Sequence, residues 1–181
     1  MRVTFRHVPP KTVLYVRALG PYARSTREAW TIMGRWLDRH GARPHMRVSM
    51  GVFLDNPATT AADLLRYDAC VPLVAGLEAD PVAGIGRQTL AGGAYAEHVL
   101  VGTHGAMGRI FSQMKRSALA ERGVTVDSGR PFVAVYLNDP TVTAQAYLRT
   151  EICVPVLPVR LVLANDDASA EPVTHPEAKQ A

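Results

Sequence analysis

An internal repeat is the feature that most limits how this chain can fold. Three pairs of landmarks share one spacing of 83 residues: Pro57 and Pro140, Asp68 and Glu151, and Cys70 and Cys153. The repeated segments are SMGVFLDNPATTAADLLRYDACVPL (49–73) and FVAVYLNDPTVTAQAYLRTEICVPV (132–156). Each alternates apolar positions around a Pro-containing turn, which is typical of a strand–turn–strand unit.

A helix-like and a strand-like segment precede each copy. Apolar residues at helical spacing predict helices over residues 25–41 and 103–123, the first opened by a Ser25–Glu28 capping box. Strand-like sequence precedes them at 11–19 and 94–102. The expected fold is α+β: tandem duplicated strand-helix-strand-strand modules with pseudo-two-fold symmetry, antiparallel sheets and a central ligand groove. The first half gains a leading strand in VTFRHV, and the second half one in PVAGIGRQTL.

The same pattern sets the expected domain limits. Residues 1–163 form one domain of two repeats, 1–75 and 93–163. A glycine-rich linker, 76–92, joins them. The tail, 164–181, is polar and acidic, so we expect it to be disordered.

Composition narrows the class of protein. Apolar residues make up 48% of the chain, enough for a sizeable core, yet no apolar run is long enough to span a membrane. No signal peptide is recognisable, so we expect a cytoplasmic protein. The two cysteines and six histidines show no ligand spacing, so we expect neither a metal nor a cofactor. Net charge is +4 without a long basic run, which gives no direct nucleic-acid motif.

Alternation along the last strand of each copy separates two faces. In the second copy Ile152 and Val154 share one face, and Glu151 shares the other with Cys153. Asp68 holds the matching position in the first copy. Because the aliphatic face is expected to lie against the helices, both acids are expected on the helix-free face.

The preceding strands suggest aromatic residues on that same face. Treating Val133 and Val135 as core positions turns Tyr136 outward, and Phe53 is its equivalent in the first copy. The resulting groove would have Gly51 and Ala134 as its floor, aromatic walls and two carboxylates, and it would suit a flat or cationic organic ligand. The alternative is that the acids are ordinary solvated strand-edge residues and the aromatics ordinary packing residues.

Several motifs together resemble one known family. They are ALGPY (18–22), W-x5-W (Trp30 and Trp36), Y-x-N-D-P (136–140) and LRTEICVPV (148–156). These resemble the GyrI-like small-molecule-binding family, which includes effector-binding domains of AraC-type and multidrug-sensing regulators and DNA gyrase inhibitory proteins. The resemblance covers roughly residues 1–163.

The resemblance implies a groove for lipophilic, often cationic or aromatic compounds. The family's key acid would fall on Glu151, and its aromatic lining on Tyr136, Phe53 and Trp30 or Trp36. Since no helix-turn-helix segment flanks the repeat, a stand-alone binding domain is expected rather than a one-component regulator.

Three functions follow as expectations. The first is sequestration or sensing of a xenobiotic anchored by Glu151. The second draws on a resemblance to hydrolases that open strained cyclopropane rings; here Glu151 would be the general base of a metal-independent reaction. The third is binding to a macromolecule such as DNA gyrase.

Overall fold

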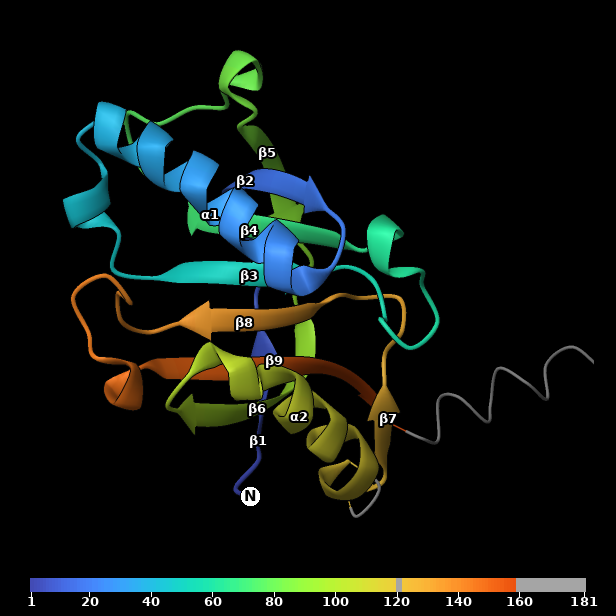
Figure 1. The fold of residues 1–181 in the computed structure, drawn as a ribbon. Coiled ribbons are helices and arrows are strands. Elements are labelled where there is room, and N and C mark those ends of the chain that lie inside the picture. Colours follow the sequence, from blue (N-terminus) through green and yellow to red (C-terminus); the bar gives the residue numbers. More distant parts are fainter. Residues whose placement is uncertain (120–121, 159–181) are drawn as a thin grey trace, which may run out of the picture.

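The computed structural model describes residues 1–119 and 122–158 as a nine-stranded antiparallel sheet with two helices packed on one face (Figure 1). The expected α+β class is therefore confirmed. The strands are β1 (Thr4–Val8), β2 (Lys11–Leu19), β3 (Ser49–Phe53), β4 (Arg66–Pro72), β5 (Gly86–Leu90), β6 (Gly93–Val101), β7 (Val124–Val126), β8 (Phe132–Tyr136) and β9 (Arg149–Pro158). The helices are α1 (Tyr22–Arg39) and α2 (Met107–Gln113), with 3-10 turns at Arg43–His45, Ala62–Leu64, Pro81–Ala83, His104–Ala106 and Gln145–Tyr147.

The two repeated segments meet at the centre of the sheet. The strand order is β1-β6-β9-β8-β3-β4-β2-β5, with β7 paired to β9 beside this path. The central pair is β3 with β8, where Gly51 stands opposite Ala134. Helix α1 packs on β2 and β4, while α2 packs on β9, so each helix covers one side of the central pair.

The outer strands correct one expectation from the sequence. The leading strand β1 pairs with β6 in the second half, and β5 pairs with β2 in the first half. Each additional strand therefore completes the half opposite to the one we expected. Residues 76–92, expected to be a linker, contain β5. The tail, 164–181, lies outside the described residues.

Both helices differ in extent from the expected ranges. Helix α1 begins at Tyr22 after Pro21, so Ser25 is not its cap but a buried helical residue that donates a hydrogen bond to the carbonyl oxygen of Gly20 (3.2 Å). The second helix is shorter than residues 103–123. Its α-helical part ends at Gln113 and continues as a π-helical turn, Met114–Ala118. Among the described residues no helix is long and apolar enough to cross a membrane.

Three clusters of buried apolar side chains fill the molecule. One lies between α1 and the sheet, around Met33 and Leu14, and a second between α2 and the sheet, around Met114 and Ile152. The third lies on the helix-free face, where Val8 and Leu90, from the ends of β1 and β5, pack against buried residues of the central strands. Both faces of the central strands are therefore apolar.

Candidate functional site

The pairing of β8 with β9 separates the residues expected to share one groove. Val135 stands opposite Glu151, and Tyr136 stands opposite Thr150. Directly paired residues share a face, so Glu151 belongs to the helix-free face and Tyr136 to the helix face. In the first half Val52 stands opposite Asp68, and Phe53 opposite Tyr67. The prediction of one groove holding both acids and both aromatics is therefore wrong.

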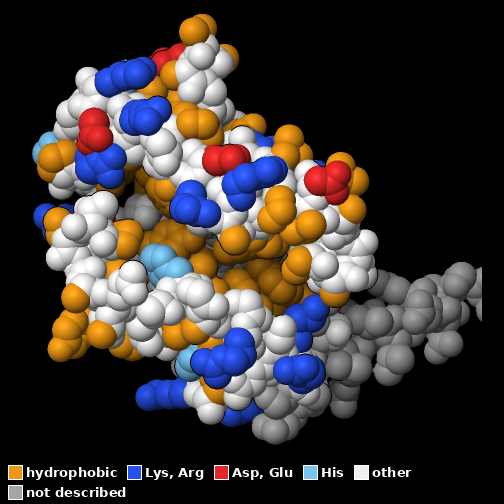
Figure 2. Space-filling model, viewed as in Figure 1, with side chains coloured by type: hydrophobic (Ala, Val, Ile, Leu, Met, Phe, Trp, Pro, Cys, Tyr) orange, Lys and Arg blue, Asp and Glu red, His pale blue; other side chains and the backbone are white. Residues whose placement is uncertain are grey.

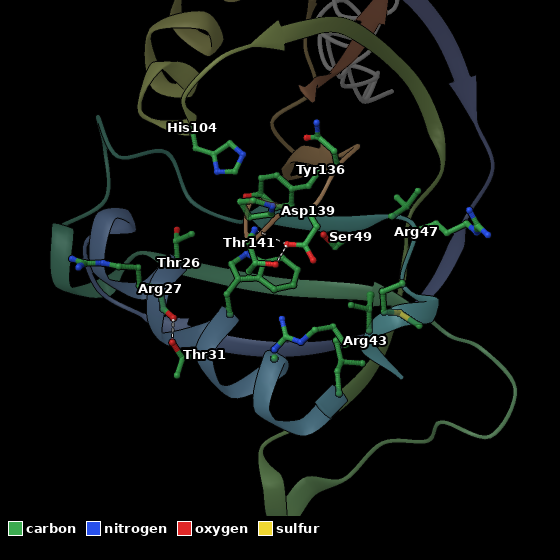
Figure 3. Close-up of a pocket in the computed structure, with 18 residues that line it drawn as sticks. Thr26, Arg27, Thr31, Arg43, Arg47, Ser49, His104, Tyr136, Asp139 and Thr141 are labelled. Carbon is green, nitrogen blue, oxygen red and sulfur yellow. Dashed lines mark hydrogen bonds between the residues drawn. The ribbon is translucent and has the colours of Figure 1, made fainter. Parts of the chain in front are cut away.

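Tyr136 borders a pocket of about 430 Å³ on the helix face, here called the helix-face pocket. Its lining comes from α1, the segment leading into β3, the turn at His104 and the loop after β8 (Figure 3). Figure 2 shows hydrophobic side chains gathered in a hollow between the two halves on this face. The lining residues are Thr26, Arg27, Trp30, Thr31, Gly34, Leu37, Arg43, Met46, Arg47, Val48, Ser49, Val71, His104, Tyr136, Asn138, Asp139, Pro140 and Thr141.

A hydrogen-bonded aromatic trio lies at this pocket: Trp30 and Tyr136 line it, and the fully buried Tyr67 lies behind them. The indole Nε1 of Trp30 donates to the hydroxyl oxygen of Tyr67 (2.8 Å), which lies 3.2 Å from the hydroxyl oxygen of Tyr136. A Cβ atom on Gly51 would lie 2.4 Å from the Tyr67 hydroxyl and 2.7 Å from the Tyr136 hydroxyl. Gly51 is thus covered by tyrosine hydroxyls and Ala134 is fully buried, so the two do not form an open floor.

Ring contacts fix the position of Tyr136. Its ring centroid lies 5.8 Å from that of Trp30 and 5.0 Å from that of His104. Burial raises the pKa of Tyr136, so its hydroxyl stays protonated, and burial lowers the pKa of His104 below its ordinary value. The pocket therefore offers an aromatic wall with a neutral imidazole at neutral pH.

The rim of the helix-face pocket is more basic than acidic. Arg43 is held by Asp38, with its Nη2 2.9 Å from Oδ2, so its charge is matched. Within the described part of the chain, Arg27 and Arg47 have no carboxylate partner. Of the described residues that line the pocket, Asp139 is the acid, and it accepts a hydrogen bond from the hydroxyl of Thr141 (2.7 Å).

Two other predicted ligand residues lie outside this pocket. Phe53 is on the helix face but packs among aromatic rings, 5.2 Å from Tyr67 and 5.7 Å from Phe111 between centroids. Trp36 is a buried residue of α1 and donates from Nε1 to the Asp80 carboxylate (3.2 Å). Of the two tryptophans, only Trp30 lines the pocket.

Asp68 is fully buried on the helix-free face and has its own partners. Arg17, directly opposite on β2, holds it through two bonds, Nε to Oδ1 (2.7 Å) and Nη2 to Oδ2 (2.8 Å). The side-chain amide of Gln88 donates to Oδ2 as well (2.8 Å). A carboxylate with this many partners stabilises the β2–β4–β5 edge and has little capacity left for a ligand.

Glu151 borders a second pocket, of about 270 Å³, on the helix-free face. We call it the acid-pair pocket, because Glu97 of β6 lies beside Glu151 there, with Cys153 and Arg6. Its other walls are mainly apolar and include Val133, Val135, Met50 and Tyr95. Desolvation, helped by the charge of Glu97 and opposed by Arg6, raises the pKa of the Glu151 carboxyl.

Sequence reasoning missed four contributors to these pockets: Arg47, His104, Glu97 and Arg6. Glu97 left a signal, since AYAEHVLVG places one acid among the apolar positions of a strand. His104 also left a signal, because the aromatic Tyr22 lies near the matching place in the first copy. Arg6 left none, since its position depends on β1 crossing to the other half.

Comparison with known proteins settles the family. The sequence profile of the GyrI-like small molecule binding domain matches residues 1–157. The chain belongs to the GyrI-like family. This confirms the resemblance seen in the sequence motifs.

Relatives of this GyrI-like chain carry different names. YosT, an SPbeta prophage-derived protein of Bacillus subtilis (strain 168) named as a transcriptional regulator, is 30% identical over 128 residues, which are 68% of this chain and 84% of YosT. DNA gyrase inhibitor 1 of Dickeya dadantii (strain 3937) is 28% identical over 141 residues, 77% of this chain and 90% of the inhibitor. The structure of SAV2435 bound to tetraphenylphosphonium shares the fold, with a TM-score of 0.56 and 17% identity over 87% of this chain and 94% of SAV2435.

Proposed function

We propose that this GyrI-like protein binds a lipophilic aromatic small molecule in the helix-face pocket. The observation that carries the proposal is the wall formed by Trp30 and Tyr136, closed by the ring of His104 at one end. A volume of about 430 Å³ falls in the range of organic-ligand pockets. Sequestration or sensing of such compounds requires only this pocket.

The charge of the ligand is a separate question. A cationic preference was expected from Glu151, but Glu151 faces away from the aromatic wall. The rim of the helix-face pocket instead offers Arg27 and Arg47 against Asp139. We therefore expect neutral or anionic aromatic compounds to bind there more tightly than cations of the same shape.

Two probes of equal shape and opposite charge test this. Tetraphenylborate and tetraphenylphosphonium are titrated into the Trp36→Phe variant, whose only tryptophan is Trp30. Both are expected to quench Trp30 fluorescence, the borate at lower concentration. Arg47→Gln is expected to weaken borate binding about three- to tenfold, as for the loss of a rim charge. Arg35→Gln, exposed and outside the pocket, is the matched control.

The reverse variant locates the ligand. Trp30→Phe retains only Trp36, which lies outside the pocket beside Asp80, so the same titration is expected to change its fluorescence little. Equal quenching in both single-tryptophan variants, or none in Trp36→Phe with either probe, would show that the pocket is not the binding site.

The geometry does not support the hydrolase alternative in its expected form. It required Glu151 to activate water against a ligand held by Tyr136 or a tryptophan. Glu151 leaves the sheet on the face opposite to Tyr136, which lines the helix-face pocket together with Trp30. Inhibition of DNA gyrase stays a second candidate, favoured by the relative named for that activity. Its test is a supercoiling assay at micromolar protein, in which an unchanged gyrase rate would remove the candidate.

We also infer that residues 1–75 and 93–163 are two copies of one unit. Equal strand registers support this, because Met50 faces Cys70 in the first half as Val133 faces Cys153 in the second. Superposing the backbone of 49–72 on that of 132–155 tests the inference. Strands that fail to overlay in this register would argue against a duplication.

A further inference from the structure

The acid-pair pocket contains a buried carboxylate that is only half satisfied. The Glu97 side chain is 3% exposed, and its Oε2 accepts a bond from Nε of Arg6 (2.6 Å). Its Oε1 is buried and has no hydrogen-bond partner among the described residues. Leaving such an oxygen unpaired costs on the order of 1–3 kcal/mol, so a missing partner is expected there.

One cation is shared between two carboxylates at this site. Arg6 bonds closely to Glu97, but its Nη2 lies 3.5 Å from Oε2 of Glu151, a weak contact. Arg6 comes from the edge strand β1, and its side chain is 59% exposed. Two carboxyl groups share one guanidinium here, and this exposed partner can move away into water.

The other half of the sheet shows what full pairing looks like. Arg17 stands opposite Asp68 and donates a hydrogen bond to each of its carboxylate oxygens. Opposite Glu151, at the corresponding place on β6, stands Val99, which offers no charge. The second half thus has an additional acid, Glu97, and has no arginine directly opposite Glu151.

A thiol completes the group. A carboxylate oxygen of Glu97, one of Glu151 and the Sγ atom of Cys153 all lie within 4.8 Å of one another. Zinc bonds to carboxylate oxygen at about 2.0–2.2 Å and to sulfur at about 2.3 Å, so small side-chain rotations would bring all three onto one ion. Two oxygens with one sulfur suit a borderline cation such as zinc better than calcium or magnesium.

We propose that Glu97, Glu151 and Cys153 form a binding site for a divalent transition-metal cation of the zinc class, reached through the acid-pair pocket. The Cys153 thiol gives its proton to solvent as the sulfur–metal bond forms. Arg6 leaves the acid pair, and the fourth coordination position faces the pocket, open to water or to a small ligand. This site is independent of the helix-face pocket.

Cadmium titration of the full chain tests the site. For this titration the protein is prepared without a polyhistidine tag, is freed of metal by a chelator and is kept reduced without added thiols. Wild type is expected to bind one equivalent of Cd²⁺ with an ultraviolet thiolate-to-cadmium charge-transfer band, and Zn²⁺ is expected to displace it. Cys153→Ser is expected to lose the band. Cys70→Ser, a buried cysteine beside the fully paired Asp68, is the matched control and is expected to retain it.

The acids and Arg6 give opposite shifts, which a merely damaged fold would not produce. Glu151→Gln and Glu97→Gln are expected to raise the Kd for Cd²⁺ at least about tenfold. Arg6→Gln removes the competing cation and is expected to lower it. Should Glu97→Gln fail to fold, Glu151→Gln and Arg6→Gln, both at partly exposed side chains, decide the question. No band in wild type and Arg6→Gln, or a band lost in Cys70→Ser but kept in Cys153→Ser, overturns the proposal.

Discussion

Tyr136 and Glu151 lie on adjacent strands and leave the sheet on opposite faces, because Glu151 pairs with Val135 and Tyr136 pairs with Thr150. The aromatic wall and the acid pair are therefore separated by the sheet itself. A small molecule bound at one does not reach the other. The two chemistries that the sequence suggested for one groove belong to two pockets.

Gly51→Ala should destabilise the centre of the sheet. The added Cβ would meet the hydroxyls of Tyr67 and Tyr136 at 2.4 and 2.7 Å, so rings held in a hydrogen-bonded trio must shift. We expect a loss of about 1–3 kcal/mol in the free energy of unfolding, measured by urea titration. Gly108→Ala in α2, where the new Cβ would meet no described residue beyond the adjacent helix backbone within 4 Å, should be neutral or stabilising. Equal results for the two variants would contradict the crowding at Gly51.

Asp68→Asn should lower stability without affecting ligand binding. It removes the charge that Arg17 and Gln88 hold, but the Arg17 side chain is 37% exposed and can turn to water. We expect a loss of about 1–3 kcal/mol by urea titration. Glu28→Gln, in the exposed pair with Arg24, should change it by less than about 0.5 kcal/mol. Weaker quenching of Trp30 by the aromatic probes in Asp68→Asn would show that Asp68 acts on the ligand.

His104 should make stability depend on pH on the acid side of neutrality. Burial lowers the pKa of His104 in the folded protein, so the unfolded chain takes up the proton first. Stability is unaffected by this group above about pH 6.5 and falls as the pH drops from there through the lower folded pKa. Comparing urea midpoints at pH 7.5 and 5 checks this. His104→Asn should reduce the acid loss, and His45→Asn, at an exposed histidine, should not.

Arg130 should be a strong contributor to the second half of the sheet. Its guanidinium donates to Asp127 (2.7 Å) and to the carbonyl oxygens of Gly92, Ala94 and Val156 (3.1, 3.0 and 3.2 Å). Arg130→Met keeps much of the volume and removes every bond, so we expect a loss of about 2–4 kcal/mol in thermal or urea unfolding. Arg87→Met, at an exposed arginine of β5, is the control and should be close to wild type.

The elements were predictable because they depend on local patterns. Alternation identified the strands around Cys70 and Cys153, and it correctly placed Ile152 and Val154 under a helix. Helical spacing predicted both helical segments, in which Met33 and Met114 are fully buried. Both the alternation and the helical spacing arise from residues that are close together in the sequence, so they can be recognised without knowing the tertiary structure.

The faces of the central strands were not predictable, for a physical reason. Val52 and Val133 are buried on the helix-free face, and Tyr136 is buried on the other. When both faces are apolar, alternation shows which residues share a face but not which face it is. Only the long-range pairing of Gly51 with Ala134 and of Cys153 with Val133 decides that.

The crossing of β1 and β5 has a consequence for any attempt to cut the protein in two. A polypeptide ending near residue 80 would carry the strand that shields β6 but would lack β5, the strand that shields β2. Each isolated fragment would expose an unpaired strand edge. Together the two fragments could cover both edges, because one supplies β1 to β6 and the other supplies β5 to β2. Co-expressed fragments should therefore be recovered as a folded complex, and fragments made alone should precipitate.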